Sequence, residues 1–180
     1  MDSQGRLNAT AASLLGVLRR HGELTGAGLV RATLLEIGEF FPLARSQAYR
    51  ELTDLADHDL VEAGPPGPRS SRPHRVTRAG EVAFLEWLAQ TPGEDSVRFP
   101  LLLTISFGSD LPPARLAELV DAHEARHREK LARYRALLPQ VEEHADAFVA
   151  ATLHLGIRYQ EATLAWFSEL PPEVRGRISR

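Results

Sequence analysis

The segment between Arg45 and Arg75 constrains the fold of this chain more than any other. It opens with a stretch of helical character whose first residues are polar and basic, RSQAYRELTDLADHDLV. Two short apolar runs follow, and a loop rich in Pro, Gly and Arg separates them, within AGPPGPRSSRPHRVT. A helix followed by a hairpin with a basic tip is the order of the recognition helix and wing of a winged helix-turn-helix. The segment therefore predicts a unit able to contact DNA.

The basic residues of this segment are clustered. Residues 45–50 and 69–78 together carry six Arg and no acid, whereas residues 51–62 carry five acids and no base. The net charge of −3 argues against a generally basic nucleic-acid coat. A phosphate backbone needs only local positive potential. Because one of the 21 basic residues is Lys and the rest are Arg, single Arg residues are weak evidence, and the clustering carries the inference.

Composition excludes several classes of protein. The chain has no cysteine, which excludes disulfides, thiolate metal sites and thiol nucleophiles. No apolar run approaches the roughly 18 residues of a membrane span. The N-terminus MDSQGRLNAT lacks the basic and then apolar order of a secretory signal. We therefore expect a cytoplasmic protein without a membrane partner.

Apolar spacing predicts a mainly α chain with a small β-hairpin wing, divided into two domains. The stretch TPGEDS at residues 91–96 is the best boundary, which gives a winged helix-turn-helix domain at 1–92 and a helical dimerisation and effector domain at 93–180. Helices are expected at 8–20, 25–38, 44–57, from 78, at 99–107, 112–138 and 146–170, strands at 60–62 and 75–77, and an apolar bridge at 40–42.

The last predicted helix carries two apolar faces. One is close to a heptad seam, and the other adds aromatic residues. Two long helices with apolar surface on more than one side cannot cover each other alone, which predicts a homodimer. The alternative is that the second face packs on the N-terminal half. The seam comprises Val149, Leu153, Ile157, Gln160, Leu164 and Phe167, and the second face Phe148, Leu155, Tyr159 and Trp166.

The start of the predicted recognition helix holds side chains suited to a major groove. Arg can form a bidentate contact with guanine and Gln with adenine, while Ser and Tyr can hold phosphate. The acids that follow, Glu51, Asp54 and Asp57, would repel DNA and are expected to face away. The predicted DNA-binding residues are Arg45, Ser46, Gln47, Tyr49 and Arg50 in the helix, and Arg69, Arg72, His74 and Arg75 in the wing.

Three segments of the first half resemble PadR-family transcriptional regulators: LNATAASLLGVLRRHGELTGAGLVR, RSQAYRELTDLADHDLVEAG and GPRSSRPHRVTRAGEVAFLEWL. The helical second half resembles the virulence-activator-like C-terminal domain. This resemblance implies a homodimeric repressor that binds a palindromic operator on double-stranded DNA and is released by a small hydrophobic or aromatic effector. His74 departs from the aromatic residue common at its position. The positions that match the family pattern are Ser46, Gln47, Tyr49 and Arg50, and in the wing Arg69, Arg72 and Pro73.

A rival site is the sequence HEARH, in which His123, Glu124 and His127 match the H-E-x-x-H pattern of zinc hydrolases. Against a zinc enzyme, the helix continues with charged residues and no third ligand has a characteristic spacing. The plain alternative is a charged helix face in which Glu124 pairs with Arg128, and both histidines lie at a dimer seam or in solvent. We expect no enzyme, no metal and no cofactor.

An effector pocket is the least defined prediction. Its aromatic members are equally explained as ordinary core, and His154 with Arg158 as a surface pair. A different class of function also stays open, namely a winged-helix module that binds an acidic protein partner and no specific DNA. The predicted effector residues are Trp87, Phe107, His154, Arg158, Tyr159 and Trp166, with Phe99 beside them.

Overall fold

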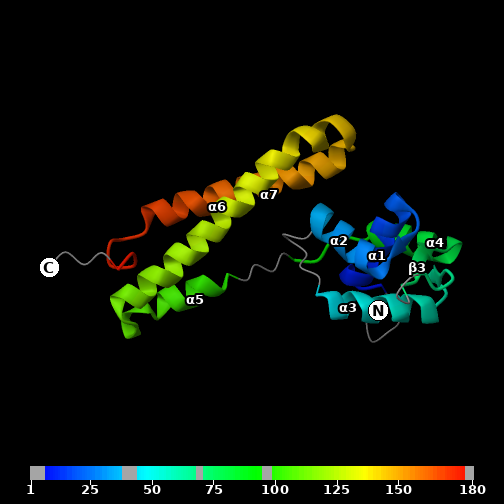
Figure 1. Cartoon of the computed structure of the whole chain (residues 1–180), viewed down its shortest axis with the longest axis horizontal. Helices are drawn as coiled ribbons and strands as arrows, with labels where there is room; N and C mark the ends of the chain where they lie inside the picture. The colour runs from blue at the N-terminus through cyan, green and yellow to red at the C-terminus, as the bar shows by residue number, and fades with distance from the viewer. Residues whose placement is uncertain (1–6, 38–43, 68–70, 95–98, 177–180) are drawn as a thin grey trace. The chain divides into compact units, whose positions relative to one another are not determined.

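The computed structural model describes residues 7–37, 44–67, 71–94 and 99–176. The chain divides into two compact units, Met1–Gly93 and Glu94–Arg180 (Figure 1). The predicted apolar bridge at residues 40–42 lies outside the described residues. Among those described, no helix combines the length and apolar character needed to cross a membrane.

The first unit is a winged helix-turn-helix, as the sequence predicts. Both ends of α1 and the start of α4 lie on residues suited to that role. Asn8 Oδ1 accepts from the backbone N–H of Ala11, Thr77 Oγ1 accepts from that of Gly80, and Gly22 ends its helix with φ 74°. The elements are α1 (Ala9–His21), β1 (Leu24–Thr25), α2 (Gly26–Ile37), α3 (Arg45–Asp57), β2 (Val61–Ala63), β3 (Pro73–Val76) and α4 (Arg78–Leu88).

The sheet has three antiparallel strands in the order β1-β3-β2. The predicted hairpin is β2 and β3, in which Val61 pairs with Val76. Sequence analysis missed β1, where Leu24 pairs with His74. Two residues are too few for an alternating pattern, and this strand exists because the wing supplies its partner.

Helix α1 is the centre of the first unit, because α2, α3, α4 and β3 all pack on it. Its apolar face is fully buried, and Phe84 of α4 lies against Gly16. One turn before Phe84 in α4, a Cβ on Gly80 would lie 2.1 Å from the carbonyl oxygen of Leu60, so only glycine allows this approach. The core comprises Ala11, Leu14, Leu15, Val17, Leu18, Leu29, Val30, Ala48, Leu52, Leu55 and Val61.

The second unit consists of α5 (Pro100–Ser106), a short 3₁₀ helix η2 (Gly108–Asp110), α6 (Pro113–His144) and α7 (Ala147–Glu169). Helices α6 and α7 pack side by side as an antiparallel pair (Figure 1). The prediction that the first of them ends near Leu138 is wrong, because α6 continues through Pro139. Proline costs the helix one hydrogen bond, but half-buried Val141 beyond it continues the packed face.

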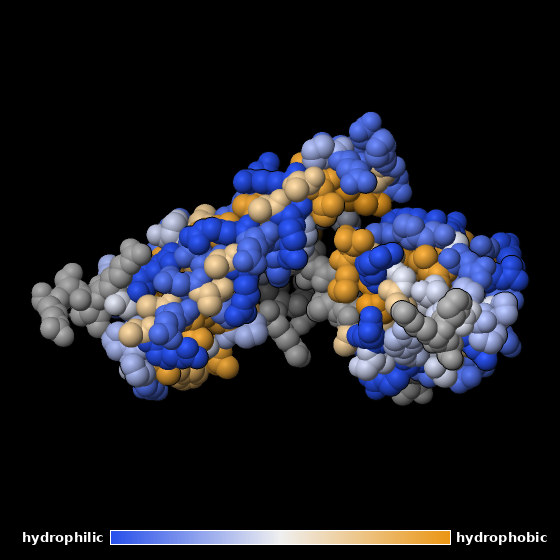
Figure 2. All heavy atoms as spheres, in the orientation of Figure 1, coloured by the Kyte–Doolittle hydropathy of each residue, from blue (hydrophilic) through white to orange (hydrophobic). Residues whose placement is uncertain are grey.

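The predicted seam of α7 faces α6 of the same chain. Ile157, Gln160 and Phe167 are buried there, and Tyr134 of α6 lies against Gly156. The second face is partly uncovered: Phe148 is 82% exposed and Leu155 is 58% exposed. Apolar side chains accordingly interrupt the hydrophilic surface of this unit (Figure 2). The seam therefore stabilises the helix pair itself, and only part of the second face remains for a partner.

Candidate nucleic-acid interface

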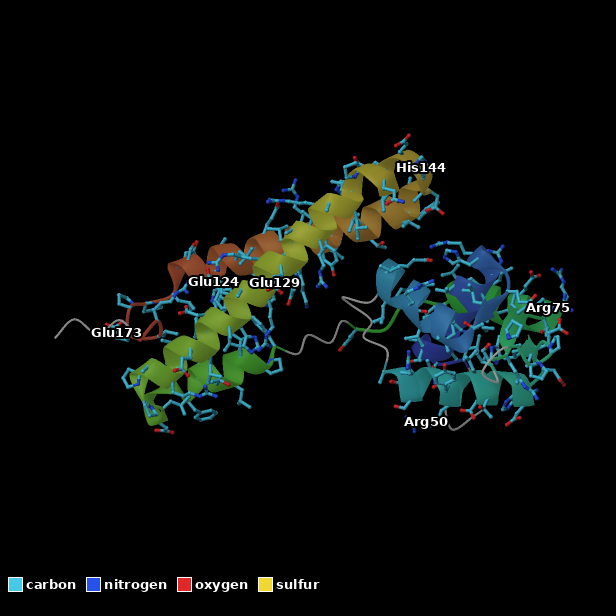
Figure 3. The ribbon with its side chains drawn as sticks, in the orientation of Figure 1. Arg50, Arg75, Glu124, Glu129, His144 and Glu173 are labelled. Atoms are coloured by element: carbon cyan, nitrogen blue, oxygen red, sulfur yellow. The ribbon has the colours of Figure 1, made fainter. Side chains whose placement is uncertain are left out.

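The outer side of α3 presents the predicted reading residues. Arg45, Ser46 and Arg50 are exposed, and Tyr49 is 43% exposed. Arg50 projects away from the body of the unit (Figure 3). The helix begins after Ala44, which has no side chain to cap the first turn. A helix start with basic residues and available backbone N–H groups is suited to bind phosphate.

The inner side of α3 holds two polar residues beside its apolar stripe. Glu51 is 9% exposed and its Oε1 accepts from Asn8 Nδ2 at 2.8 Å. Gln47 is half-buried, and its Nε2 donates to Thr10 Oγ1 at 3.1 Å. Glu51 faces away from the reading side, as expected of an acid, whereas Asp54 and Asp57 are exposed. Gln47, predicted to reach adenine, is turned towards α1 instead.

Tyr49 of α3 lies against the start of α2. A Cβ built on Gly26, the first residue of α2, would lie 2.4 Å from Cε1 and 3.2 Å from the hydroxyl of Tyr49. Glycine at this position lets the aromatic ring lie directly against the backbone. The ring is therefore held by α2 and remains partly exposed to solvent.

The wing presents two exposed arginines in the described residues, while the predicted contact Arg69 lies outside them. Arg72 stands at the start of β3 and is exposed. Arg75 is exposed and pairs through its guanidinium with Glu62, its partner across β2 and β3 (Figure 3). This pair at the surface is weak, so Arg75 is able to exchange Glu62 for a phosphate.

His74 occupies the middle strand of the wing, between Ala63 and Leu24. It is half-buried, and its Nδ1 has no hydrogen-bond partner among the described residues. Burial lowers the pKa of His74; a backbone hydrogen bond with Leu24 opposes this effect, and the positive charge of Arg72 adds to it. The neutral imidazole therefore serves the packing of the wing, and its share in phosphate contact stays a prediction.

The predicted effector residues are divided between the two units. Trp87 belongs to α4 of the first unit, and the remaining five belong to the second. There Trp166 packs on Phe167 with ring centroids 4.9 Å apart, while Phe107 is 62% exposed. His154 pairs with Glu142 at 3.2 Å and Arg158 with Glu161 at 2.9 Å. Both residues are exposed and each lies beside a different carboxylate, and their part in an effector site stays a prediction.

The HEARH segment lies on α6 and is held by ion pairs and hydrogen bonds. Buried Glu124, which Figure 3 labels on α6, pairs with Arg128, as the plain alternative predicts. It also pairs with Arg175, which follows α7 in the chain. His127 is buried, and its Nδ1 lies 2.5 Å from Gln160 Oε1. The expectation that His127 lies at a dimer seam or in solvent is therefore wrong, because the apolar pairing of α6 with α7 encloses it.

A metal site does not form around these histidines in the part of the chain that the structure describes. No group of three His, Asp or Glu residues is placed there to hold an ion. Burial lowers the pKa of His123, and the charges of Arg126 and His127 lower it further. Arg175 was missed by sequence reasoning because 51 residues separate it from Glu124, and no local pattern marks such a pair.

The second unit also has an open pocket of about 330 Å³ beside this ion-pair cluster. Its lining is mainly polar and includes Asp121, Glu124, Arg128, Ser168 and Arg175. None of the predicted effector residues lines it. Because Arg175 and Glu124 already satisfy each other, the pocket is the outer surface of a structural ion-pair cluster.

Comparison with known proteins adds the family context. Residues 97–172 match the family described as "Virulence activator alpha C-term". The chain matches no curated protein sequence. Solved structures match it over nearly its whole length. The PadR-like transcriptional regulator BC1756 from Bacillus cereus matches with a TM-score of 0.78 and 16% identity over 94% of this chain and 99% of that chain.

Two further solved structures extend this likeness. PadR from Bacillus subtilis in complex with operator DNA matches with a TM-score of 0.71 and 20% identity, over 89% of this chain and 96% of that chain. The virulence activator AphA from Vibrio cholerae matches with a TM-score of 0.64 and 22% identity, over 93% of this chain and 96% of that chain. These proteins are regulators, as the resemblance in the sequence implies. This chain therefore has the fold of the PadR-like transcriptional regulators, with a winged helix-turn-helix first unit and a virulence-activator-type helical second unit.

Proposed function

We propose that this protein is a transcriptional regulator that reads double-stranded DNA with α3 and the wing. The observation that carries the proposal is the distribution of charge along α3, in which the exposed bases lie at the start and the exposed acids Asp54 and Asp57 lie in the second half. Arg45 and Arg50 face solvent at its start, whereas Glu51 is turned into the domain. Arg72 and Arg75 are exposed on the wing. A basic, polar helix start beside a basic wing suits a major groove flanked by phosphates. The solved structure of Bacillus subtilis PadR with operator DNA supports this reading.

The regulator acts as a homodimer on a palindromic operator and represses transcription. The exposed apolar residues Phe148 and Leu155 of α7 support pairing, because a single chain leaves them in water. A twofold dimer presents two copies of α3. These copies must lie roughly 34–36 Å apart to meet successive major grooves.

A small hydrophobic or aromatic effector releases the protein from DNA. The support is the solved structure of Bacillus subtilis PadR in complex with p-coumaric acid. The residues proposed to meet the effector are those named from the sequence, Trp87, Phe107, His154, Arg158, Tyr159 and Trp166. Quenching of tryptophan fluorescence by a panel of aromatic acids tests this part, since both tryptophans belong to the set.

Footprinting on the DNA that flanks the gene tests the proposal as a whole. The expected result is protection of an inverted repeat whose half-sites lie about one helical turn apart. Protection that follows no sequence, together with tight binding of an acidic protein, would favour a protein-binding module instead. Such a module would not show the steep fall of DNA affinity with salt that phosphate contacts produce.

A further inference from the structure

Asn8 makes two hydrogen bonds that join different parts of the first unit. Its Oδ1 caps α1 by accepting from Ala11 N at 2.8 Å. Its Nδ2 donates to Glu51 Oε1 at 2.8 Å, across 43 residues of sequence. One side chain thus fixes the start of α1 and holds the second turn of α3.

A second link lies close by on the same two helices. Gln47 Nε2 donates to Thr10 Oγ1 at 3.1 Å. Gln47 and Glu51 are four residues apart, so they lie on one face of α3, one turn above the other. Their partners Asn8 and Thr10 both belong to the beginning of α1. The two links therefore act on the same face of α3 from the same end of α1.

These links lie in the half of α3 that apolar packing holds least. Across residues 45–51, Ala48 is the one buried apolar side chain, and a methyl group makes few contacts. The larger anchors, Leu52 and Leu55, lie in the second half of the helix. No side-chain cap fixes the first turn at Ala44. The orientation of the reading half thus depends on these polar contacts together with the Tyr49 ring that lies against Gly26.

We propose that Glu51 and Gln47 are positioning residues that set the rotation of α3 about its axis, through Asn8 and Thr10. This inference rests on the proposed function of α3 as the DNA reader. Neighbouring residues on a helix are about 100° apart. Arg50 precedes Glu51 directly, so any rotation of α3 at Glu51 carries Arg50 with it and moves its guanidinium relative to the base edges.

If Glu51 positions α3, replacing it changes DNA affinity in the opposite direction to that expected from the loss of its charge alone. Glu51 and Asp54 are both acids of α3, but Asp54 is exposed. If Glu51 acted only by its charge, Glu51→Ala and Asp54→Ala would both strengthen DNA binding by reducing repulsion. If Glu51 positions the helix, Glu51→Ala weakens operator binding while Asp54→Ala does not. Glu51→Gln keeps an acceptor for Asn8 and should restore binding.

The measurement is the ratio of dissociation constants for the footprinted operator and a scrambled duplex of equal length. Glu51→Ala is expected to raise the dissociation constant for the operator, relative to that for the scrambled duplex, by at least about fivefold, the cost of roughly one mismatched base pair. Affinity for the scrambled duplex, and its salt dependence, should stay as in the wild type. Retention of full operator preference by Glu51→Ala would overturn the proposal.

A second measurement needs no DNA. Asn8→Ser keeps a side chain that caps helices but is too short to reach Glu51. In chemical unfolding, Asn8→Ser and Glu51→Ala should together destabilise the protein less than the sum of their separate effects. Additive effects would overturn the link itself. Absence of operator preference in the wild type, with non-additive unfolding, would instead refute the proposed function and leave the link in place.

Discussion

The ring of Tyr49 lies against Gly26, and a Cβ at Gly26 would stand 2.4 Å from Cε1 of that ring. Tyr49 is 43% exposed, so its ring can swing outward without moving the backbone. We therefore expect Gly26→Ala to displace the Tyr49 side chain and to weaken operator binding, with a change in unfolding free energy of about 1 kcal/mol or less. Titration of operator DNA and chemical unfolding measure the two effects.

The control for this prediction is the same substitution in a Tyr49→Ala background. With the ring removed, Gly26→Ala has nothing left to displace and should not reduce DNA affinity further. An equal loss of affinity in both backgrounds would show that the substitution acts on α2 and not through Tyr49.

The half-buried His74 should make the first unit less stable in mild acid. Burial lowers the pKa of His74 in the folded state, whereas the unfolded chain keeps a value of about 6.5. The stabilisation from the neutral imidazole is complete above about pH 6.5 and is lost as the pH falls from there through the folded pKa. Thermal unfolding between about pH 7.5 and 5.5 measures it.

His74→Phe is the matched variant, because it fills the same position without a titrating group. Its melting temperature should fall less over this pH interval than that of the wild type. Parallel curves for the two proteins would mean that other groups cause the acid sensitivity.

Glu124 should stabilise the second unit through Arg175 and not through a metal. Arg175 is 13% exposed and pairs with Glu124, and it donates to the carbonyl oxygen of Phe167. Glu124→Ala removes one hydrogen-bonding partner of the Arg175 guanidinium and should lower the free energy of unfolding by about 1–3 kcal/mol. The control is Glu129→Ala, at an exposed residue of α6 (Figure 3), which should lower the free energy of unfolding by less than about 0.5 kcal/mol.

The same measurement separates the ion-pair role from a zinc site. Washing the protein with a chelator should leave its melting temperature unchanged, because the described histidines and carboxylates form no metal cage. A fall in melting temperature that added zinc reverses would contradict this account of the HEARH segment.

Phe148 and Leu155 should support the proposed dimer. Their exposure of 82% and 58% leaves an apolar surface on α7. Replacing both with Ser should shift the protein from dimer to monomer in sedimentation at micromolar concentration. Leu88→Ser, at an apolar residue of α4 that is 59% exposed, is the control and should leave the dimer intact. A wild-type protein that sediments as a monomer would contradict the homodimer directly.

The helices were predictable because their signals are local. Asn8 and Thr77 carry cap side chains at the expected positions, and Gly22 ends α1 with φ 74°. Strand β1 was not predictable, because Leu24 and Thr25 become a strand only when β3 lies beside them. Likewise, nothing near Pro139 in the sequence shows that α7 packing carries α6 past it.

The candidate site was predictable in composition and less so in orientation. Charge clustering indicated Arg45 and Arg50, and both are exposed. The side chain of Gln47 points towards α1 because it donates a hydrogen bond to Thr10, which is 37 residues away in the sequence. A hydrogen bond between two distant, common residue types leaves no pattern in a single sequence, so Gln47 was assigned to the outer face.

A salt titration of operator binding by the wild type and three variants tests the central claim most directly. Arg50→Ala removes an exposed side chain of α3, and Arg72→Ala removes an exposed side chain of the wing. The control, Arg133→Ala, removes an exposed side chain of α6. Arg50→Ala should lower operator affinity by about 5- to 150-fold and reduce discrimination against other sequences. Arg72→Ala should weaken binding to all sequences and reduce the salt slope by about one. Arg133→Ala should bind as the wild type does. Equal affinities and equal salt slopes for all four proteins would contradict the claim that α3 and the wing read DNA.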